Sequence, residues 1–358
     1  MSRREIERAL LEWIAEGVDA ARDESRFEAL ALELFAYQYA HNIPYRKLCQ
    51  AFGVRTGDVQ HWREIPPVPT GAFKEARLAS FPETQTVRTF RTSGSTRAGR
   101  GELELDTLEL YEASLLATFG AYICPEAKRL RFMVLAPSAA DAPDSSLSHM
   151  FDVACRELGS AESAFYIDRD GWEPERLIAD LCVLEEPVAL VGTAFAFVHL
   201  LDALAERGLE LALPEGTRVM ETGGFKGRSR EVPRDELHGA LAARLGVPTF
   251  RIVNQYGMCE LGSQFYEASL RSGIPTQSKR VPPWVRTRVV DPESMQDLAP
   301  GEPGLLVHYD LVNTGSVLAV QTSDLGRSTR EGFELLGRVA AAEARGCSIA
   351  ADALLGSP

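Results

Sequence analysis

The chain has 358 residues, of which 45% are hydrophobic and 25% are charged, and its net charge is −13 at pH 7. These values are typical of a soluble globular protein, and the length allows two domains or one large domain with an appendage. The acidic balance argues against non-specific binding to nucleic acid. It does not exclude a nucleotide pocket, because salt screens charges beyond about 10 Å.

The cysteines and the N-terminus indicate a cytoplasmic chain. The six cysteines form no C-x-x-C pair and show no metal-ligand spacing with histidine, so we expect reduced thiols. The N-terminal stretch MSRREIERALLEWIAEG is charged and amphipathic, unlike a signal peptide. No uncharged apolar run reaches about 18 residues, so we expect no membrane span.

The predicted elements change character along the chain. Apolar residues recur at helical spacing over 3–52, and the proline-rich stretch 65–69 predicts an extended connection. Strand-like runs then alternate with helical patterns, which favours an α/β body with a largely parallel sheet. One of these helices is predicted at 106–121, with Asp106 as its N-cap. Short β segments separated by turns follow residue 285.

We therefore predict four segments. They are a helical N-terminal cap at 1–65, an α/β nucleotide-binding body at 66–284, a β-rich lobe at 285–336 and a short C-terminal tail at 337–358.

The loop TSGSTRAGR at 92–100 lies between two predicted strands and suits the binding of a phosphate. Its glycines let backbone N–H groups approach an anion, its hydroxyls add hydrogen bonds, and arginine offers a fork of donors. It is not a G-x-x-x-x-G-K-[ST] P-loop, because it contains no lysine. The alternative is a polar hairpin loop.

A second loop, ETGGFKGR at 221–228, follows a predicted strand directly and precedes a helix. Ligands of open α/β sheets bind at this place, outside the carboxyl ends of the strands. Gly223 and Gly224 permit close approach to a flat ring, and Lys226 places a cation beside it. A generic strand-to-helix turn is the alternative.

Two further loops carry polar or aromatic side chains. In NQYGMCE at 254–260, Tyr256 can stack on a base and Glu260 can offer a hard oxygen to Mg²⁺. In TSDLG at 322–326, Asp324 can accept hydrogen bonds from ribose hydroxyls. Ordinary turns with a solvated acidic residue remain the alternative for both.

Taken in order, the four loops resemble the phosphate loop, adenine loop, Y-G-x-x-E motif and ribose-binding aspartate of the acyl-adenylate-forming superfamily. The closer resemblance is to LuxE-type acyl-protein synthetases, with phenylacetate-CoA-ligase-like enzymes as cousins. It extends over nearly the whole chain and includes the segments at 36–49, 66–80, 221–230 and 336–348.

The resemblance implies the N-terminal-type fold of adenylate-forming enzymes and the use of ATP and Mg²⁺. A carboxylic acid, fatty or aryl, would attack the α-phosphorus of ATP, giving acyl-AMP and pyrophosphate. The acyl group would then pass to a thiol and on to an acyl-accepting protein such as a reductase or a carrier. An acyl-CoA ligase and a non-catalytic nucleotide-binding subunit of a reductase-type complex are the alternatives.

The resemblance also implies roles for individual residues. It places the phosphate contacts at Thr92, Ser93, Gly94, Ser95 and Thr96, with Arg97 or Arg100 as counter-charge. It places the adenine contacts at Gly223, Gly224, Tyr256 and Gly257. Glu260 would bind Mg²⁺, Asp324 would bind ribose, and Arg338 would touch ribose or phosphate.

The sequence departs from the superfamily pattern at two places. Arg97 and Arg100 stand near the position where the phosphate loop usually has a lysine, and a planar fork differs in geometry from an ammonium. Only 20 residues follow Arg338, so we expect no lid domain with a catalytic lysine within this chain. Lys226 is the predicted substitute that stabilises the transferring phosphate.

Cys347 is the predicted acyl acceptor, because LuxE-type enzymes have a cysteine close to the C-terminus. A thiolate is a good nucleophile toward an activated acyl group, and Arg345 can lower its pKa. The alternative is a small apolar residue packed among alanines and glycines, and Cys259 beside Glu260 is a rival by location only. The apolar stretch 192–199, with Phe195 and Phe197, is a candidate lining of the carboxylate pocket, and core packing of the two phenylalanines is the alternative.

Overall fold

The computed structural model describes residues 1–92, 99–126, 129–223 and 232–338. These residues form two compact units. Unit 1 comprises Met1–Ala117, Met258–Gln264 and the described part of Ser278–Pro358, whereas unit 2 comprises Thr118–Gly257 and Phe265–Gln277. The units group segments that are distant along the chain, so the predicted domain boundaries at 65, 284 and 336 stay a prediction.

Three helices open unit 1 and confirm the helical prediction for the first 52 residues: α1 (Arg3–Ala15), α2 (Glu24–His41) and α3 (Ile43–Ala51). Each begins at a polar cap. The side chains of Ser2, Asp23 and Asn42 accept hydrogen bonds from backbone N–H groups of the first turn, which the helix itself leaves without acceptors. The helix starts were therefore local features of the sequence.

These helices share a core with the β-strands of the same unit. Gln38 of α2 donates to Asn313 O at 2.7 Å and accepts from Leu318 N at 2.9 Å, so a buried amide ties this helix to the connection between β12 and β13. The ring of Trp62 packs edge-on against Phe27 and Tyr309, with centroids 5.5 and 4.8 Å away. The predicted N-terminal cap is thus part of the core of unit 1.

The strands of unit 1 confirm the predicted β-rich region. They are β10 (Lys279–Arg280), β11 (Val285–Val290), β12 (Pro303–Asp310), β13 (Ala319–Ser328) and β14 (Gly332–Arg338), paired antiparallel in the order β11-β12-β13-β14-β10. A short strand, β1 (Val68–Pro69), runs parallel to the first half of β13.

A second, two-stranded sheet in unit 1 is formed by β2 (Arg88–Arg91) and β3 (Glu102–Leu105), which flank the predicted phosphate loop. The short helix α4 (Ala72–Glu75) follows β1. Single 3₁₀ turns lie at η1 (Thr56–Asp58), η2 (Trp62–Glu64) and η3 (Glu83–Gln85).

Unit 2 contains the predicted parallel sheet. Its strands are β5 (Ala164–Phe165), β4 (Arg131–Leu135), β6 (Val188–Thr193), β7 (Arg218–Thr222) and β8 (Ile252–Tyr256), all parallel in this order, with β9 (Phe265–Glu267) antiparallel to β8. The helices are α6 (Ser146–Leu158), α7 (Pro174–Cys182), α8 (Ala194–Glu206), α9 (Arg234–Leu245) and α10 (Ser269–Ser272), and η4 (Thr249–Arg251) precedes β8.

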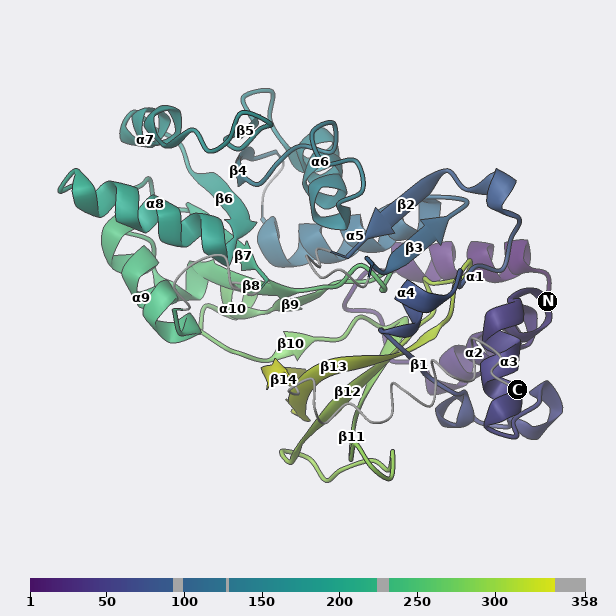
Figure 1. Ribbon diagram of the computed structural model, residues 1–358. Coiled ribbons are helices and arrows are strands. Elements are labelled where there is room, and N and C mark those ends of the chain that lie inside the picture. Colours follow the sequence, from purple (N-terminus) through teal and green to yellow (C-terminus); the bar gives the residue numbers. More distant parts are fainter. Residues whose placement is uncertain (93–98, 127–128, 224–231, 339–358) are drawn as a thin grey trace. The chain divides into compact units, whose positions relative to one another are not determined.

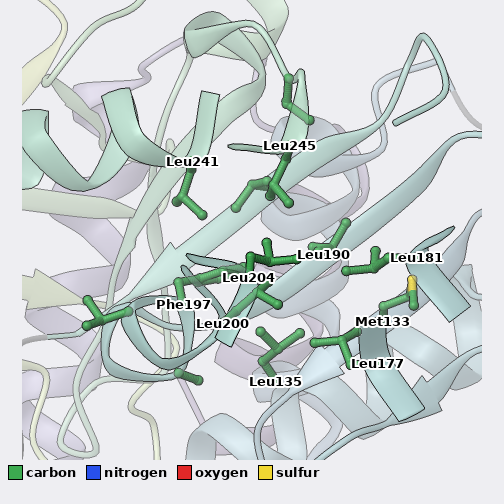
Figure 2. Close-up of a cluster of buried hydrophobic side chains, with 14 of the residues drawn as sticks. Met133, Leu135, Leu177, Leu181, Leu190, Phe197, Leu200, Leu204, Leu241 and Leu245 are labelled. Carbon is green, nitrogen blue, oxygen red and sulfur yellow. The ribbon is translucent and has the colours of Figure 1, made fainter. Parts of the chain in front are cut away.

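Both faces of this sheet are buried, as its continuous apolar strands require. On one face, Met133 and Leu190 meet leucines of α7, α8 and α9 (Figure 2), and these helices flank the strands in Figure 1. On the other face, Phe132 packs against Phe119 at 5.7 Å. Neighbouring residues of β4 thus serve opposite cores, because side chains alternate along a strand.

One local prediction was wrong. The helix α5 (Glu109–Ile123), in which the division between the units falls, begins three residues after the predicted cap Asp106. Both guanidinium ends of Arg3 donate to the two oxygens of Asp106, each at 2.6 Å. This bidentate pair with a residue 103 positions away was not visible in the local sequence.

The predicted absence of a membrane span agrees with the described helices: none combines the length and the hydropathy needed to cross a bilayer.

Candidate active site

Asp324 and Arg338, predicted for ribose and phosphate, lie side by side in unit 1. They are register partners on β13 and β14, and Arg338 Nε donates to Asp324 Oδ1 at 2.7 Å. The carboxylate is buried, while the arginine side chain is 71% exposed. Gly337 precedes the arginine with φ +144°, a backbone conformation that side chains rarely adopt. The pair therefore presents an exposed cation directly over a buried acceptor.

Glu260 belongs to the same charged cluster. Burial raises the pKa of this carboxyl to about 7, its own backbone N–H and the charges of Arg338 and Lys74 oppose that rise, and Asp324 adds to it. A buried carboxylate whose ionised form is penalised gains most from an incoming cation. We call Lys74, Glu260, Asp324 and Arg338 the charged cluster of unit 1.

The loop that carries Glu260 is held by two buried polar residues that sequence reasoning missed. Asp310 accepts from Ser263 N at 2.7 Å and from Ser263 Oγ at 2.8 Å, and burial raises its pKa to about 6. Asn313 donates to Glu260 O at 2.9 Å. At Gly262 an added Cβ would lie 2.5 Å from Val312 Cγ1, so only glycine fits. No sequence motif marks these anchors, because they act from the distant end of β12.

The charged cluster suits a magnesium site that is completed by the nucleotide. The described part of the chain contains no group of three or more His, Cys, Asp or Glu side chains able to hold a metal. Mg²⁺ commonly binds one or two carboxylates together with substrate phosphates and water. The buried carboxylate of Glu260 fits that pattern. It does not fit a site in which protein side chains supply all the metal ligands.

The base of the predicted phosphate loop is closed by internal hydrogen bonds. Gly101 N donates to Thr92 Oγ1 at 2.9 Å, and Thr92 N donates to Gly101 O. Arg100 Nε donates to Thr92 O at 2.6 Å. Thr92 and Arg100 therefore both join the two ends of the loop, and their predicted phosphate contacts stay a prediction.

In unit 2, the predicted adenine residues lie at the carboxyl edge of the parallel sheet. Thr222 of β7 and Gln255 of β8 are register partners, so Gly223 and Tyr256 follow neighbouring strand positions. Gly223 has φ +82°, and the largely buried ring of Tyr256 lies 5.8 Å from that of Phe265. Gly257 follows directly. The placement is that of ligand sites in open α/β sheets.

Below this edge lies a buried polar network. Glu221 Oε1 lies 2.6 Å from Asn254 Nδ2 and 3.0 Å from His238 Nε2. Glu267, fully buried, accepts from Arg234 Nη2 at 2.7 Å and from Asn254 N at 3.1 Å. The network links α9 to β7, β8 and β9, and it fixes the strand end that precedes Gly223.

The candidate lining at 192–199 falls mostly in the core. α8 begins at Ala194, capped by Thr193, and Phe197 packs within the hydrophobic cluster of Figure 2. Phe195 is half-buried, with its ring 4.4 Å from that of His199. Of the two phenylalanines, only Phe195 remains a candidate for contact with an acyl group.

Several predicted residues lie outside the described part of the chain. They are Ser93, Gly94, Ser95, Thr96, Arg97, Gly224, Lys226 and Cys347. Of the described ones, Thr92, Arg100, Glu260, Asp324 and Arg338 belong to unit 1, whereas Gly223, Tyr256 and Gly257 belong to unit 2.

Comparison with known families supports the same interpretation. The family described as acyl-protein synthetase, LuxE, matches residues 5–355. The chain belongs to this family. The LuxE family resemblance predicted from the four loops is thereby confirmed.

Among curated relatives of this LuxE family chain are two ligases. A long-chain-fatty-acid–luciferin-component ligase from Aliivibrio fischeri is 26% identical over 328 residues, which cover 88% of this chain and 81% of the relative. The ligase of the same name from Vibrio harveyi is 24% identical over 332 residues, covering 88% and 84%.

Solved structures confirm the predicted fold class. A 2-hydroxyisobutyryl-CoA ligase in complex with 2-HIB-AMP has a TM-score of 0.64 at 16% identity, covering 87% of this chain and 68% of that one. ATP-bound MatB from Rhodopseudomonas palustris has a TM-score of 0.50 at 18% identity, covering 71% and 48%. The LuxE family chain therefore has the fold of adenylate-forming ligases. Its family and its curated relatives show that it is an acyl-adenylate-forming enzyme.

Proposed function

We propose that this enzyme activates a fatty acid with ATP and Mg²⁺ and then transfers the acyl group to the thiol of Cys347 and on to a partner protein. The observation that carries the proposal is the charged cluster of unit 1, where a buried glutamate lies in electrostatic reach of the Asp324–Arg338 pair. The fatty acid is suggested by the names of the curated relatives.

In the first half-reaction, a carboxylate oxygen of the acid attacks the α-phosphorus of ATP. The bond from that phosphorus to the bridging oxygen breaks, and pyrophosphate leaves with the electron pair. Asp324 would accept hydrogen bonds from ribose hydroxyls, and Arg338 would hold the nucleotide from its exposed side. Positioning and charge neutralisation supply most of the catalysis in such phosphoryl chemistry.

Glu260 would hold Mg²⁺, which neutralises phosphate charge when it is bound. The carboxylate suits this role because burial penalises its ionised form and raises its pKa to about 7, so an incoming cation would stabilise that form.

In the second half-reaction, a thiolate attacks the carbonyl carbon of acyl-AMP, a thioester forms, and AMP leaves. The environment of three other cysteines disfavours them as the nucleophile. Burial raises the pKa of Cys49, Cys124 and Cys155 to about 12, so each remains a thiol at neutral pH. This comparison supports Cys347 over those three, and exposed Cys182 serves as a control.

The test has two steps. ATP–pyrophosphate exchange is measured with fatty acids of graded length, and the protein is then incubated with ATP and the best acid before peptide mass analysis. We expect acid-dependent exchange and an acyl mass on the peptide of Cys347. The Cys347→Ser variant should exchange normally but carry no acyl group, while Cys182→Ser should behave like the wild type.

Coenzyme A is the second candidate acceptor, because the solved 2-hydroxyisobutyryl-CoA ligase shares this fold. Normal exchange without a labelled cysteine, together with formation of acyl-CoA, would favour it. Binding of ATP without exchange for any acid would contradict the proposed activity.

A further inference from the structure

The short helix α4 follows a strand that pairs with β13, the strand that carries Asp324. β1 pairs in parallel with β13, in the register Val68 to Val320 and Pro69 to Gln321. The next residue continues the ladder, since Thr70 N donates to Gln321 O at 3.0 Å. The chain therefore enters α4 alongside the half of β13 that leads to Asp324.

The same helix packs against the base of the predicted phosphate loop. Phe73 is buried, and its Cβ lies 3.4 Å from the place that a Cβ on Gly101 would take. Thr92 Cγ2 lies 3.2 Å from the same place. Because Gly101 and Thr92 close that loop by hydrogen bonds, α4 packs against the loop base, and β1 joins the start of this helix to β13 within unit 1.

Lys74 is the next residue of α4, and its side chain is exposed. Within the described residues it forms no hydrogen bond or ion pair, in contrast to Arg338, which is paired with Asp324. Its charge nevertheless acts on buried Glu260, as the charge of Arg338 does. The other described lysines differ, since Lys279 is buried in β10 and Lys47 lies on α3.

Adenylation needs a cation beside the two reacting anions. The substrate carboxylate and the α-phosphate are both anionic, and they must approach to bonding distance. An ammonium group is a compact charge with three donors, so it can bridge two anions. The donors of a guanidinium lie in one plane and suit two oxygens of a single carboxylate or phosphate. Such a charge is most effective when the protein holds it ready beside the reacting atoms.

We propose that Lys74 is a catalytic residue of the adenylation half-reaction, in which its ammonium bridges the substrate carboxylate and a non-bridging α-phosphate oxygen. The inference rests on the proposed function and adds to it a residue with no assigned role. Lys74 stays protonated throughout: the carboxylate oxygen bonds to phosphorus, pyrophosphate leaves, and no proton is transferred. The role earlier predicted for Lys226 is then filled from α4.

The test compares Lys74→Met with Lys47→Met, which removes an exposed lysine from α3 of the same unit. Acid-dependent ATP–pyrophosphate exchange should fall about 100-fold in Lys74→Met and stay within twofold in Lys47→Met. Lys74→Arg should recover only part of the loss, because the fork changes the geometry. Equal melting temperatures would show that all variants are folded.

A second measurement separates chemistry from general damage. Each variant is given the synthetic acyl-AMP of the acid that exchanges fastest in the wild type, and thioester formation is followed. Lys74→Met should form thioester at the wild-type rate, since the adenylation step is bypassed. Equal loss in both half-reactions would overturn the inference, as would wild-type exchange by Lys74→Met.

The rival lysine is tested in the same assay. If Lys226→Met loses exchange while Lys74→Met keeps it, the bridging cation is Lys226 and the inference is overturned. If none of the tested acids supports ATP–pyrophosphate exchange by the wild type, the proposed function is wrong, and so is the role of Lys74. If the wild type shows acid-dependent exchange, the result for Lys74→Met tests only the role of Lys74 and not the proposed function.

Discussion

Buried glutamates are treated differently in the two units. In unit 2, Glu221 and Glu267 each lie within hydrogen-bond distance of two side-chain or backbone partners. In unit 1, Glu260 has its own backbone N–H and two more distant cations, and its pKa rises to about 7. A carboxylate with fixed partners stabilises the fold, whereas one that keeps a desolvation cost is suited to a ligand that brings positive charge.

The difference matters because burial alone would have marked all three residues as equivalent. Their partners differ. Glu221 and Glu267 link strands to α9, whereas the charges of Arg338 and Lys74 act on Glu260 and lower its pKa. Substitutions of these three glutamates should therefore affect different quantities: stability for Glu221 and Glu267, and catalysis for Glu260.

The largest expected effect is on stability in unit 2. Glu221→Leu removes the acceptor shared by Asn254 and His238 in a buried site, and the free energy of unfolding should fall by about 4 kcal/mol. Chemical denaturation measures it. The double variant Glu221→Leu/His238→Leu should be less unstable than the sum of the single variants, since no polar ring is then left without its carboxylate. Strict additivity would contradict the coupling.

Asp310 should make the stability of unit 1 depend on pH. Its pKa is raised from 3.8 to about 6 by burial, so the folded state binds a proton more tightly than the unfolded state. The stabilising effect of that proton is complete below pH 4 and is lost as the pH rises through 6. The free energy of unfolding of the wild type, relative to Asp310→Asn, should fall by about 3 kcal/mol over that interval. A flat difference between the two proteins would show that the carboxyl does not titrate there.

Glu260→Gln should affect catalysis and spare the fold. Loss of the carboxylate should lower acid-dependent ATP–pyrophosphate exchange about 100-fold, because the amide is a poor ligand for Mg²⁺. The melting temperature at pH 8 should be unchanged or higher, since a penalised buried charge is removed. Glu293→Gln, at an exposed position in the same unit, is the matched control and should leave both quantities unchanged. A destabilised Glu260→Gln with normal exchange would place Glu260 among the structural carboxylates.

The smallest effect is expected at the base of the phosphate loop. Arg100 Nε donates to Thr92 O, so Arg100→Ala should change the Kd for ATP by less than about threefold. Calorimetric measurement of the Kd for ATP in Arg100→Ala and in Arg97→Ala distinguishes the two arginines. A larger loss of ATP affinity in Arg100→Ala than in Arg97→Ala would show that Arg100 is the arginine that contacts the phosphate.

Much of the fold could be read from local patterns. The helices over 3–52, the alternation of strands and helices in unit 2 and the short strands after 285 were all visible as apolar periodicity and turn residues. The start of α5 was not, because Asp106 is a good cap by residue type but its carboxylate is bound by Arg3 across the unit.

The candidate site divides in the same way. Asp324, Glu260 and Arg338 lie in stretches that resemble motifs of the superfamily, so the sequence could name each of them as a candidate. Lys74, Asp310 and Asn313 lie in no motif that predicts chemistry, and their relevance depends on where β1, β12 and the turn after it are placed.

The amino-acid sequence by itself determined the family, the class of fold and the reaction class, because these follow from motifs and periodicities that span only a few residues each. Tertiary structure alone decided which buried carboxylate has fixed hydrogen-bond partners and which has a raised pKa. That distinction depends on donors supplied by residues distant in sequence, such as His238 for Glu221 and Arg3 for Asp106. A hydrogen bond acts over about 3 Å of space whatever the separation along the chain, so only the folded arrangement could assign it.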